Sequence, residues 1–325
     1  MNSIPRTWKS TLGHSPGYHA GAPALSLSPL MRISFLGLGA IGRPMAAHLA
    51  RSHELTVWNR TARRAVEFAQ LHAARVAQTP QMAAENADVL LTCLPNSGEV
   101  QQILEGPEGI LSGIQTGALF LDCTSGEPAA SVRIAARLEA QGVDFADAPV
   151  SGGTNGAEAG TLTVMVGGSD ATFERAKPIL AQFAKRIEHM GPVGAGHAMK
   201  AINNALLAVS ILAFGEGMVG LVKGGVQARK ALDVLNASSG RSFVSEVLVP
   251  DRVMTGAWPV TFRLALLAKD VDIACRFLEE QGIKSPLLHR ASELLNEARA
   301  RLGEGADYME AIRLQEQDAG AEIRG

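Results

Sequence analysis

The sequence is poor in cysteine, and its few cysteines are not spaced for a structural role. Cys93, Cys123 and Cys275 are the only three in 325 residues, and none forms a C-x-x-C pair. The sequence therefore predicts neither a disulfide framework nor a bound metal. Three unpaired thiols are consistent with a reducing compartment, and we expect a cytoplasmic location.

An excess of charge of either sign is also lacking. The 30 lysine and arginine residues nearly balance the 32 aspartate and glutamate residues, so bulk electrostatics predict no nucleic-acid and no membrane partner. The longest apolar stretch, 201–222, is interrupted by Asn203, Asn204 and Glu216 and has no flanking aromatic anchors. We therefore expect a buried helix there rather than a membrane span.

Residues 1–30 lack aspartate and glutamate and show neither helical nor strand periodicity. They contain no apolar core long enough for a secretory signal, and only Arg6 and Lys9 supply the positive charge that a transit peptide needs. We expect a disordered extension, or an upstream start codon with the working start at Met31.

From Arg32 onward the sequence alternates apolar runs with helical patterns, which is typical of a parallel sheet built from βαβ units. Beyond a turn-rich hinge at 190–196, helical periodicity dominates. We expect an α/β protein with a Rossmann-type doubly wound sheet in a dinucleotide-binding domain at 31–193. An all-helical substrate and oligomerisation domain should follow at 194–325. The expected strands are 33–36, 55–58, 89–93, 119–122, 143–146 and 162–166, and the expected helices are 43–51, 62–71, 200–224, 228–237, 262–281 and 287–302.

A glycine-rich loop directly follows the first expected strand, ISFL. It reads Gly37-Leu38-Gly39-Ala40-Ile41-Gly42, and a helix comes next. Gly37 permits a tight turn, Gly39 lets backbone approach a pyrophosphate, and Gly42 allows close helix–strand packing, while the helix N-terminus stabilises phosphate charge. A glycine turn without ligand is the alternative, but the strand–loop–helix context favours a dinucleotide site.

The end of the second expected strand indicates which dinucleotide binds. An NAD site usually has an acidic residue there, which accepts hydrogen bonds from the ribose hydroxyls. This chain has Asn59, Arg60 and Thr61 instead, so no carboxylate at this point repels a 2′-phosphate and Arg60 offers charge-assisted donors. We predict NADP(H) as the preferred cofactor and NAD(H) as the alternative. The other interpretation of Arg60 is a solvated loop charge.

Ser151, Gly152 and Gly153 follow a strand in the later half of the α/β part. The carboxyl ends of strands face the ligand crevice of an open sheet, and a hydroxyl with two exposed amides can hold a small carboxylate. A simple turn is an equally good interpretation of this segment by itself.

Lys200 and Asn204 lie four residues apart and share one face of an expected helix. That face continues into Leu207 and Ile211, which should be buried, so a lysine there is costly unless it is paired or used. A lysine in a partly dry site loses its proton more readily and can serve as acid or base. The alternative is that Lys200 extends to solvent from the helix start. We interpret His197 as structural.

Six stretches, in order, resemble the β-hydroxyacid dehydrogenase family, which includes 3-hydroxyisobutyrate dehydrogenase, tartronate semialdehyde reductase and glyoxylate/succinic semialdehyde reductase. They are FLGLGAIGRPMAAHL, TCLP, DCTSGEP, DAPVSGGTNGAEAGTLTVMVGG, GPVGAGHAMKAINN and FRLALLAKD. The resemblance implies an NAD(P)-dependent enzyme that moves a hydride between nicotinamide and a small 3-hydroxy acid or its semialdehyde. It also implies a homodimer or homotetramer.

The resemblance implies roles for single residues as well. Lys200 would be the catalytic acid/base, assisted by Asn204. The substrate would be held by Ser151, Gly152, Gly153, Asn204, Phe262 and Asp270, and the cofactor by the first glycine loop, Asn59, Arg60, Thr61, Leu94, Pro95, Ser125 and Lys269.

Two departures from the family pattern bear on these roles. The family's D-x-S-T segment is here Asp122-Cys123-Thr124-Ser125, so either hydroxyl could reach the cofactor. Glu99 stands where some members have an asparagine that contacts the cofactor, and that contact is not carried over.

Several alternatives remain open. A 6-phosphogluconate dehydrogenase shares this architecture but carries Lys-x-x-His-Asn, where this chain has Asn203, and a longer helical domain. An imine reductase usually lacks the lysine found at 200, and a dinucleotide-binding module without catalysis would have no need of it. Within the family, activity like that of 3-hydroxyisobutyrate dehydrogenase is our first interpretation. Reduction of glyoxylate, succinic semialdehyde or tartronate semialdehyde is the second.

Overall fold

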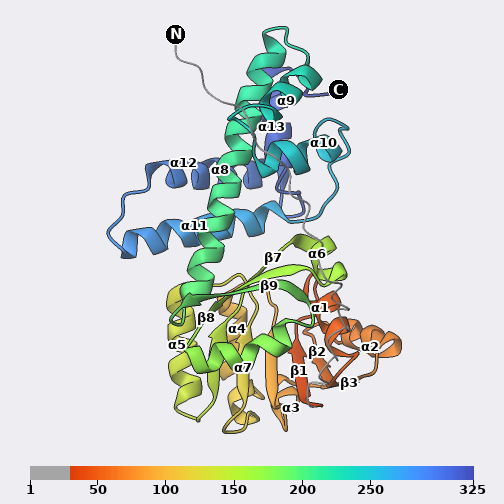
Figure 1. Cartoon of the computed structure of the whole chain (residues 1–325), viewed down its shortest axis with the longest axis vertical. Coiled ribbons are helices and arrows are strands. Elements are labelled where there is room, and N and C mark those ends of the chain that lie inside the picture. Colours follow the sequence, from red (N-terminus) through yellow and green to blue (C-terminus); the bar gives the residue numbers. More distant parts are fainter. Residues whose placement is uncertain (1–29) are drawn as a thin grey trace, which may run out of the picture.

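A computed structural model describes residues 30–325 (Figure 1). The extension expected at 1–30 lies, except for Leu30, outside the described residues. The described chain forms a sheet flanked by helices, followed by a group of helices that stands on one edge of the sheet region (Figure 1). The predicted Rossmann-type sheet with an all-helical C-terminal part is confirmed.

The sheet has the strand order β3-β2-β1-β4-β5-β6-β8-β7, and β9 pairs with β8. All neighbours from β3 to β6 are parallel, whereas β8 is antiparallel to β6 and β7 and parallel to β9. The order reverses beside β1, and open α/β sheets generally bind ligands at such a point, next to the carboxyl ends of the strands. The strands are β1 Arg32–Leu36, β2 Glu54–Trp58, β3 Ala74–Val76, β4 Val89–Thr92, β5 Leu119–Asp122, β6 Asp144–Asp147, β7 Val150–Ser151, β8 Leu162–Gly167 and β9 Ala184–Gly191.

Helices cover both faces of this sheet. Successive residues of a strand point to opposite faces, so Leu91 of β4 packs in one apolar cluster and Leu90 in another. Apolar residues on both faces are characteristic of parallel strands that are covered by helices on either side. These helices are α1 Gly42–Leu49, α2 Ala62–Leu71, α3 Pro80–Ala84, α4 Ser97–Glu105, α5 Pro128–Glu139, α6 Gly153–Ala159 and α7 Asp170–Leu180.

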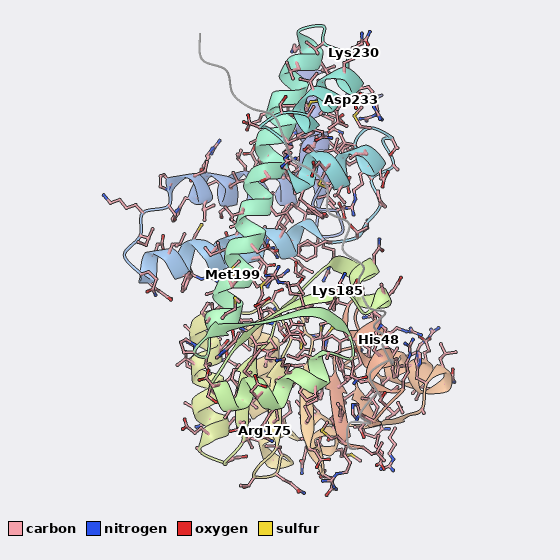
Figure 2. The ribbon with its side chains drawn as sticks, in the orientation of Figure 1. His48, Arg175, Lys185, Met199, Lys230 and Asp233 are labelled. Carbon is pink, nitrogen blue, oxygen red and sulfur yellow. The ribbon has the colours of Figure 1, made fainter. Side chains whose placement is uncertain are left out.

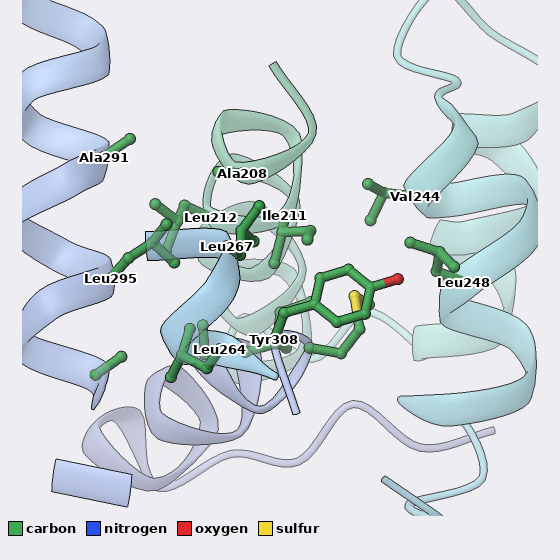
Figure 3. Close-up of a cluster of buried hydrophobic side chains, with 14 of the residues drawn as sticks. Ala208, Ile211, Leu212, Val244, Leu248, Leu264, Leu267, Ala291, Leu295 and Tyr308 are labelled. Atoms are coloured by element: carbon green, nitrogen blue, oxygen red, sulfur yellow. The ribbon is translucent and has the colours of Figure 1, made fainter. Parts of the chain in front are cut away.

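The second part is built around the long helix α8, which rises from the sheet (Figure 1). Its core joins Ile211 and Leu212 of α8 to Leu264, Leu267 and Leu295 from two other helices (Figure 3). The helices are α8 Ala195–Lys223, α9 Ala228–Asn236, α10 Val249–Arg252, α11 Leu264–Glu280, α12 Pro286–Leu302 and α13 Glu310–Ala319, with a π-helical turn at Val244–Leu248.

Among the described residues, α8 is the one helix whose length and apolar composition would suffice to cross a membrane. It packs against α11, α12 and α13, and Ile211 is fully buried while Leu207 is half-buried. A core helix of a globular protein passes the same test, so this finding is weak evidence for a membrane span.

Two sequence-based boundaries were wrong. The hinge expected at 190–196 is partly regular structure, because Met190 and Gly191 end β9 and α8 already begins at Ala195. The half-exposed strand AKRIEHMG has no clear alternation, so its pairing with β8 left no signal in the sequence. The helix expected at 262–281 begins only at Leu264, because the amide of Phe262 donates to Asp307 at 3.1 Å instead of opening the helix.

Candidate active site

The first glycine loop joins β1 to α1 at the point where the strand order reverses. Gly37 has φ +108°, and a Cβ there would clash with the carbonyl oxygen of Cys93. A Cβ at Gly42 would clash with the carbonyl oxygen of Gly37. Both positions therefore require glycine for the loop to fold over the ends of β1 and β4.

Gly39 differs from these two glycines, because a Cβ there would meet no protein atom within 4 Å. Packing within the chain does not demand glycine at this position, so its effect is to leave the backbone open beside the N-terminus of α1. That opening and the partial positive charge of the helix end fit the pyrophosphate of a dinucleotide.

Of the residues that follow β2, Asn59 holds neighbouring loops in place and Arg60 is exposed. Asn59 Oδ1 accepts from the amide of Leu38 at 2.9 Å, and its Nδ2 donates to the carbonyl of Thr61 at 3.0 Å. Asn59 thus ties the glycine loop to the next loop. The Arg60 side chain is 74% exposed and lies 3.3 Å from Glu99 of α4. Arg60 and Thr61 are therefore the side chains left to meet a ligand.

The loops after β4 and β5 are held together by the hydroxyl of Thr124. This buried hydroxyl accepts from the amide of Leu94 at 3.1 Å, and Leu94 in turn packs beside Gly37. Pro95 and Ser125 are half-buried next to this contact. Since the Thr124 hydroxyl is engaged within the protein, Ser125 is the better candidate of the two to bind a cofactor through its hydroxyl.

The segment Ser151–Gly153 lies at the junction of β7 and α6. Gly152 and Gly153 are exposed and have φ +135° and +64°, so both backbones adopt conformations that favour glycine. His48 of α1 fastens the far end of α6: its Nε2 donates to two carbonyls of the last turn, each at 3.1 Å (Figure 2). Hydrogen bonds therefore join α1, which follows the first glycine loop, to α6, which follows Ser151.

The start of α8 is anchored in the sheet by Asp147, the last residue of β6. Its carboxylate accepts from the amides of Gly194 and His197 at 2.6 and 2.7 Å. Burial raises the pKa of Asp147, and its contacts with His197 and Gly194 oppose that rise. The buried His197 ring also bonds Ser131 of α5 at 2.6 Å, which confirms its structural role. These contacts set the direction of α8 one turn before Lys200.

A chain of polar contacts joins α8 to α11 and to the loop after β5. Lys269 of α11 donates to the carbonyl of Ser125 at 2.5 Å and pairs with the Asp270 carboxylate at 2.7 Å. The other oxygen of Asp270 accepts from Asn204 Nδ2 at 2.6 Å. Asp270 is only 2% exposed, so a buried carboxylate links α8, α11 and the loop after β5.

Lys200 lies one turn before Asn204, next to Met199, which Figure 2 labels where α8 leaves the sheet. Its side chain is half-buried. Burial lowers the pKa of Lys200, the nearby Asp270 raises it, and the nearby Lys269 lowers it further. This net lowering brings the pKa of Lys200 closer to physiological pH, so the amine can both take up and release a proton, as an acid/base group requires.

Phe262 belongs to the loop before α11. Its ring meets Tyr308 edge-on at 5.7 Å and packs against the core of the helical part. The structure thus brings Lys200, Asn204, Lys269, Asp270 and Ser125 together by direct contacts or charge. Phe262 is placed by its packing in the helical core, and the Ser151–Gly153 segment lies in a separate part of the chain, at the junction of β7 and α6.

Sequence reasoning missed the polar groups that support this arrangement, above all the buried Asp122 and Asp147 and the half-buried His48. Asp122 accepts from the hydroxyl of Thr92 at 2.8 Å and from the amide of Thr124 at 3.1 Å. The available signal was an aspartate at the end of each of two buried strands, LFLD and DFAD. Within residues 30–325 no group of three or more His, Cys, Asp and Glu side chains is placed to hold a metal ion.

Comparisons with known proteins agree with this fold. Residues 32–191 match the family described as the NAD binding domain of 6-phosphogluconate dehydrogenase. Residues 194–315 match the family described as the NAD-binding domain of NADP-dependent 3-hydroxyisobutyrate dehydrogenase.

Relatives match over most of the chain. The 2-(hydroxymethyl)glutarate dehydrogenase of Eubacterium barkeri is 36% identical over 303 residues, which cover 91% of this chain and 98% of that protein. The human mitochondrial 3-hydroxyisobutyrate dehydrogenase is 33% identical over 290 residues, covering 87% and 85%. The structure of 3-hydroxyisobutyrate dehydrogenase from Mycobacterium tuberculosis with L-serine has a TM-score of 0.80 at 30% identity, covering 88% and 99%. The chain belongs to the β-hydroxyacid dehydrogenase family of NAD(P)-dependent oxidoreductases.

Proposed function

We propose that this protein is an NADP(H)-preferring dehydrogenase of small 3-hydroxy acids, with Lys200 as general acid/base. The observation that carries the proposal is the half-buried Lys200, which lies one turn before Asn204 on α8 and near the Asp270 carboxylate that Asn204 binds. A surface lysine would keep its ordinary pKa and its hydration, whereas burial lowers the pKa of this one.

The residues of the chain supply proton transfer and positioning, and bound NADP(H) would accept or donate the hydride. In oxidation, neutral Lys200 Nζ takes the proton of the substrate hydroxyl as the hydride leaves the adjacent carbon. In reduction, protonated Lys200 gives that proton to the carbonyl oxygen. The hydrogen bond from Asn204 to Asp270 fixes α8 against α11 and thereby positions Lys200, one turn earlier on α8.

The Ser151–Gly153 segment and the names of the relatives support the proposed substrate class. Its two exposed glycine amides suit a small carboxylate. The related proteins are named for 2-(hydroxymethyl)glutarate and 3-hydroxyisobutyrate. A substrate like 3-hydroxyisobutyrate is therefore our first assignment, and reduction of glyoxylate, succinic semialdehyde or tartronate semialdehyde is the second.

Steady-state kinetics across these hydroxy acids and aldehydes, with each nicotinamide cofactor, test the assignment. We expect the highest kcat/KM for a 3-hydroxy acid or its semialdehyde and a higher value with NADP(H) than with NAD(H), since Arg60 and Thr61 would supply the hydrogen-bond donors for a 2′-phosphate. Activity restricted to substrates outside the panel would contradict the substrate class. A preference for NAD(H) would contradict the cofactor assignment alone.

We also propose that the chain forms a homodimer or homotetramer through α8. Met199, Leu206 and Leu221 are 42%, 59% and 39% exposed along this helix, an apolar surface that a second copy would cover. Leu206→Glu is expected to shift the protein to a smaller species in light scattering coupled to size-exclusion chromatography, because the charge would be buried at the contact. A wild-type monomer at micromolar concentration would exclude the oligomer.

A further inference from the structure

A carboxylate lies beside the arginine assigned to the 2′-phosphate. Glu99 Oε1 is 3.3 Å from Arg60 Nη1. Glu99 belongs to the first turn of α4, which follows β4, whereas Arg60 follows β2. Because β2 and β4 flank β1, the two loops meet above the same glycine loop. The place proposed for the 2′-phosphate therefore has an acidic side chain beside it, although no acidic residue directly follows β2.

The two partners differ in how firmly they are held. The Glu99 side chain is 27% exposed and the Arg60 side chain 74%. The backbone amide of Glu99 donates to the capping Asn96 side chain at 2.9 Å, which fixes the first turn of α4. A negative charge is also favoured near a helix N-terminus. The carboxylate is thus the enclosed partner, and the guanidinium can turn toward a ligand.

Resting on the NADP(H) preference proposed above, we propose that Glu99 is a specificity-determining residue that limits the preference for NADP(H) over NAD(H). A 2′-phosphate that binds Arg60 either shares the guanidinium with Glu99 or displaces Glu99 from it, and in both cases the phosphate lies near a like charge. A ribose 2′-hydroxyl carries no charge and can donate a hydrogen bond to a carboxylate. Glu99 therefore weakens the binding of NADP(H) and favours the binding of NAD(H).

Glu99→Gln tests this proposal, because glutamine keeps the size of the side chain and removes its charge. Exposed ion pairs add little to stability, so the fold should be retained. Calorimetric titration of the full-length chain with adenosine 2′,5′-bisphosphate should show about tenfold tighter binding, as expected from removing one nearby like charge. Binding of 5′-AMP should weaken by no more than about twofold, because the glutamine oxygen can still accept a hydrogen bond from the 2′-hydroxyl.

Glu105→Gln is the matched control, since Glu105 ends the same helix and pairs with Arg137 at 3.1 Å. It should leave both affinities unchanged. No gain for the bisphosphate in Glu99→Gln, or an equal gain in Glu105→Gln, would overturn the role of Glu99.

Arg60→Ala separates this role from the proposed cofactor preference. If that preference is right, Arg60→Ala weakens bisphosphate binding whether or not Glu99 is also replaced. Unchanged binding in Arg60→Ala would refute the NADP(H) assignment itself. Weaker binding in Arg60→Ala without a gain in Glu99→Gln would refute the role of Glu99 alone.

Discussion

Lys200→Ala is expected to lower kcat for 3-hydroxy acid oxidation by about two to four orders of magnitude, the range that general acid/base groups contribute. The affinity for NADPH should change by less than about twofold, because the nucleotide site at Gly37–Gly42 is built from other segments. Steady-state kinetics and fluorescence titration with NADPH measure the two quantities separately.

Two further variants narrow the interpretation of this result. Lys200→Arg keeps a positive charge but cannot lose its proton in the accessible pH range, so it should be nearly as inactive as alanine. Lys230→Ala removes an exposed lysine on α9, which Figure 2 shows far from Met199, the chain neighbour of Lys200, and it should retain full turnover. High activity in Lys200→Arg would mean that charge, not proton transfer, is what the site requires.

Asp270→Asn is expected to move the pH dependence of oxidation to lower pH. The Asp270 carboxylate raises the pKa of Lys200 against the lowering by burial, so its removal lowers that pKa further. Oxidation needs the neutral amine, and its rate should therefore rise at a lower pH than in the wild type. Reduction needs the protonated amine and should fall off at a lower pH.

The same substitution should also lower kcat/KM by about 10- to 100-fold, because Asn204 and Lys269 lose a charged hydrogen-bond acceptor. Asp272→Asn on the same helix is the control, since Asp272 contacts Ser292 and Asn296 of α12 instead. Its pH profile should match the wild type. A profile for Asp270→Asn that is unchanged, or displaced to higher pH, would refute the electrostatic coupling.

The parts of the site that lie close together in the chain could be predicted from sequence. The loop at Gly37–Gly42 follows from a strand, three glycines and a helix, and the shared face of Lys200 and Asn204 follows from their spacing. The fold class likewise follows from the alternation of strands and helices.

The contacts between distant segments could not be predicted in this way. Lys269 reaches the backbone of Ser125 across 144 positions, and Asp147 caps a helix that begins 48 residues later. Such contacts depend on how the sheet and the helices pack, which periodicity within one segment does not encode. The same limit applies to Glu99 beside Arg60, where the acidic group comes from α4 and not from the strand end that sequence motifs inspect.

The central claim is that Lys200 carries the substrate proton, and chemical rescue of Lys200→Ala tests it most directly. Single-turnover oxidation of the 3-hydroxy acid with saturating NADP⁺ is followed as NADPH forms, with and without a small primary amine. The account predicts very slow hydride transfer without amine and a rate that increases with the concentration of the neutral amine. Turnover at the wild-type rate without added amine would contradict it.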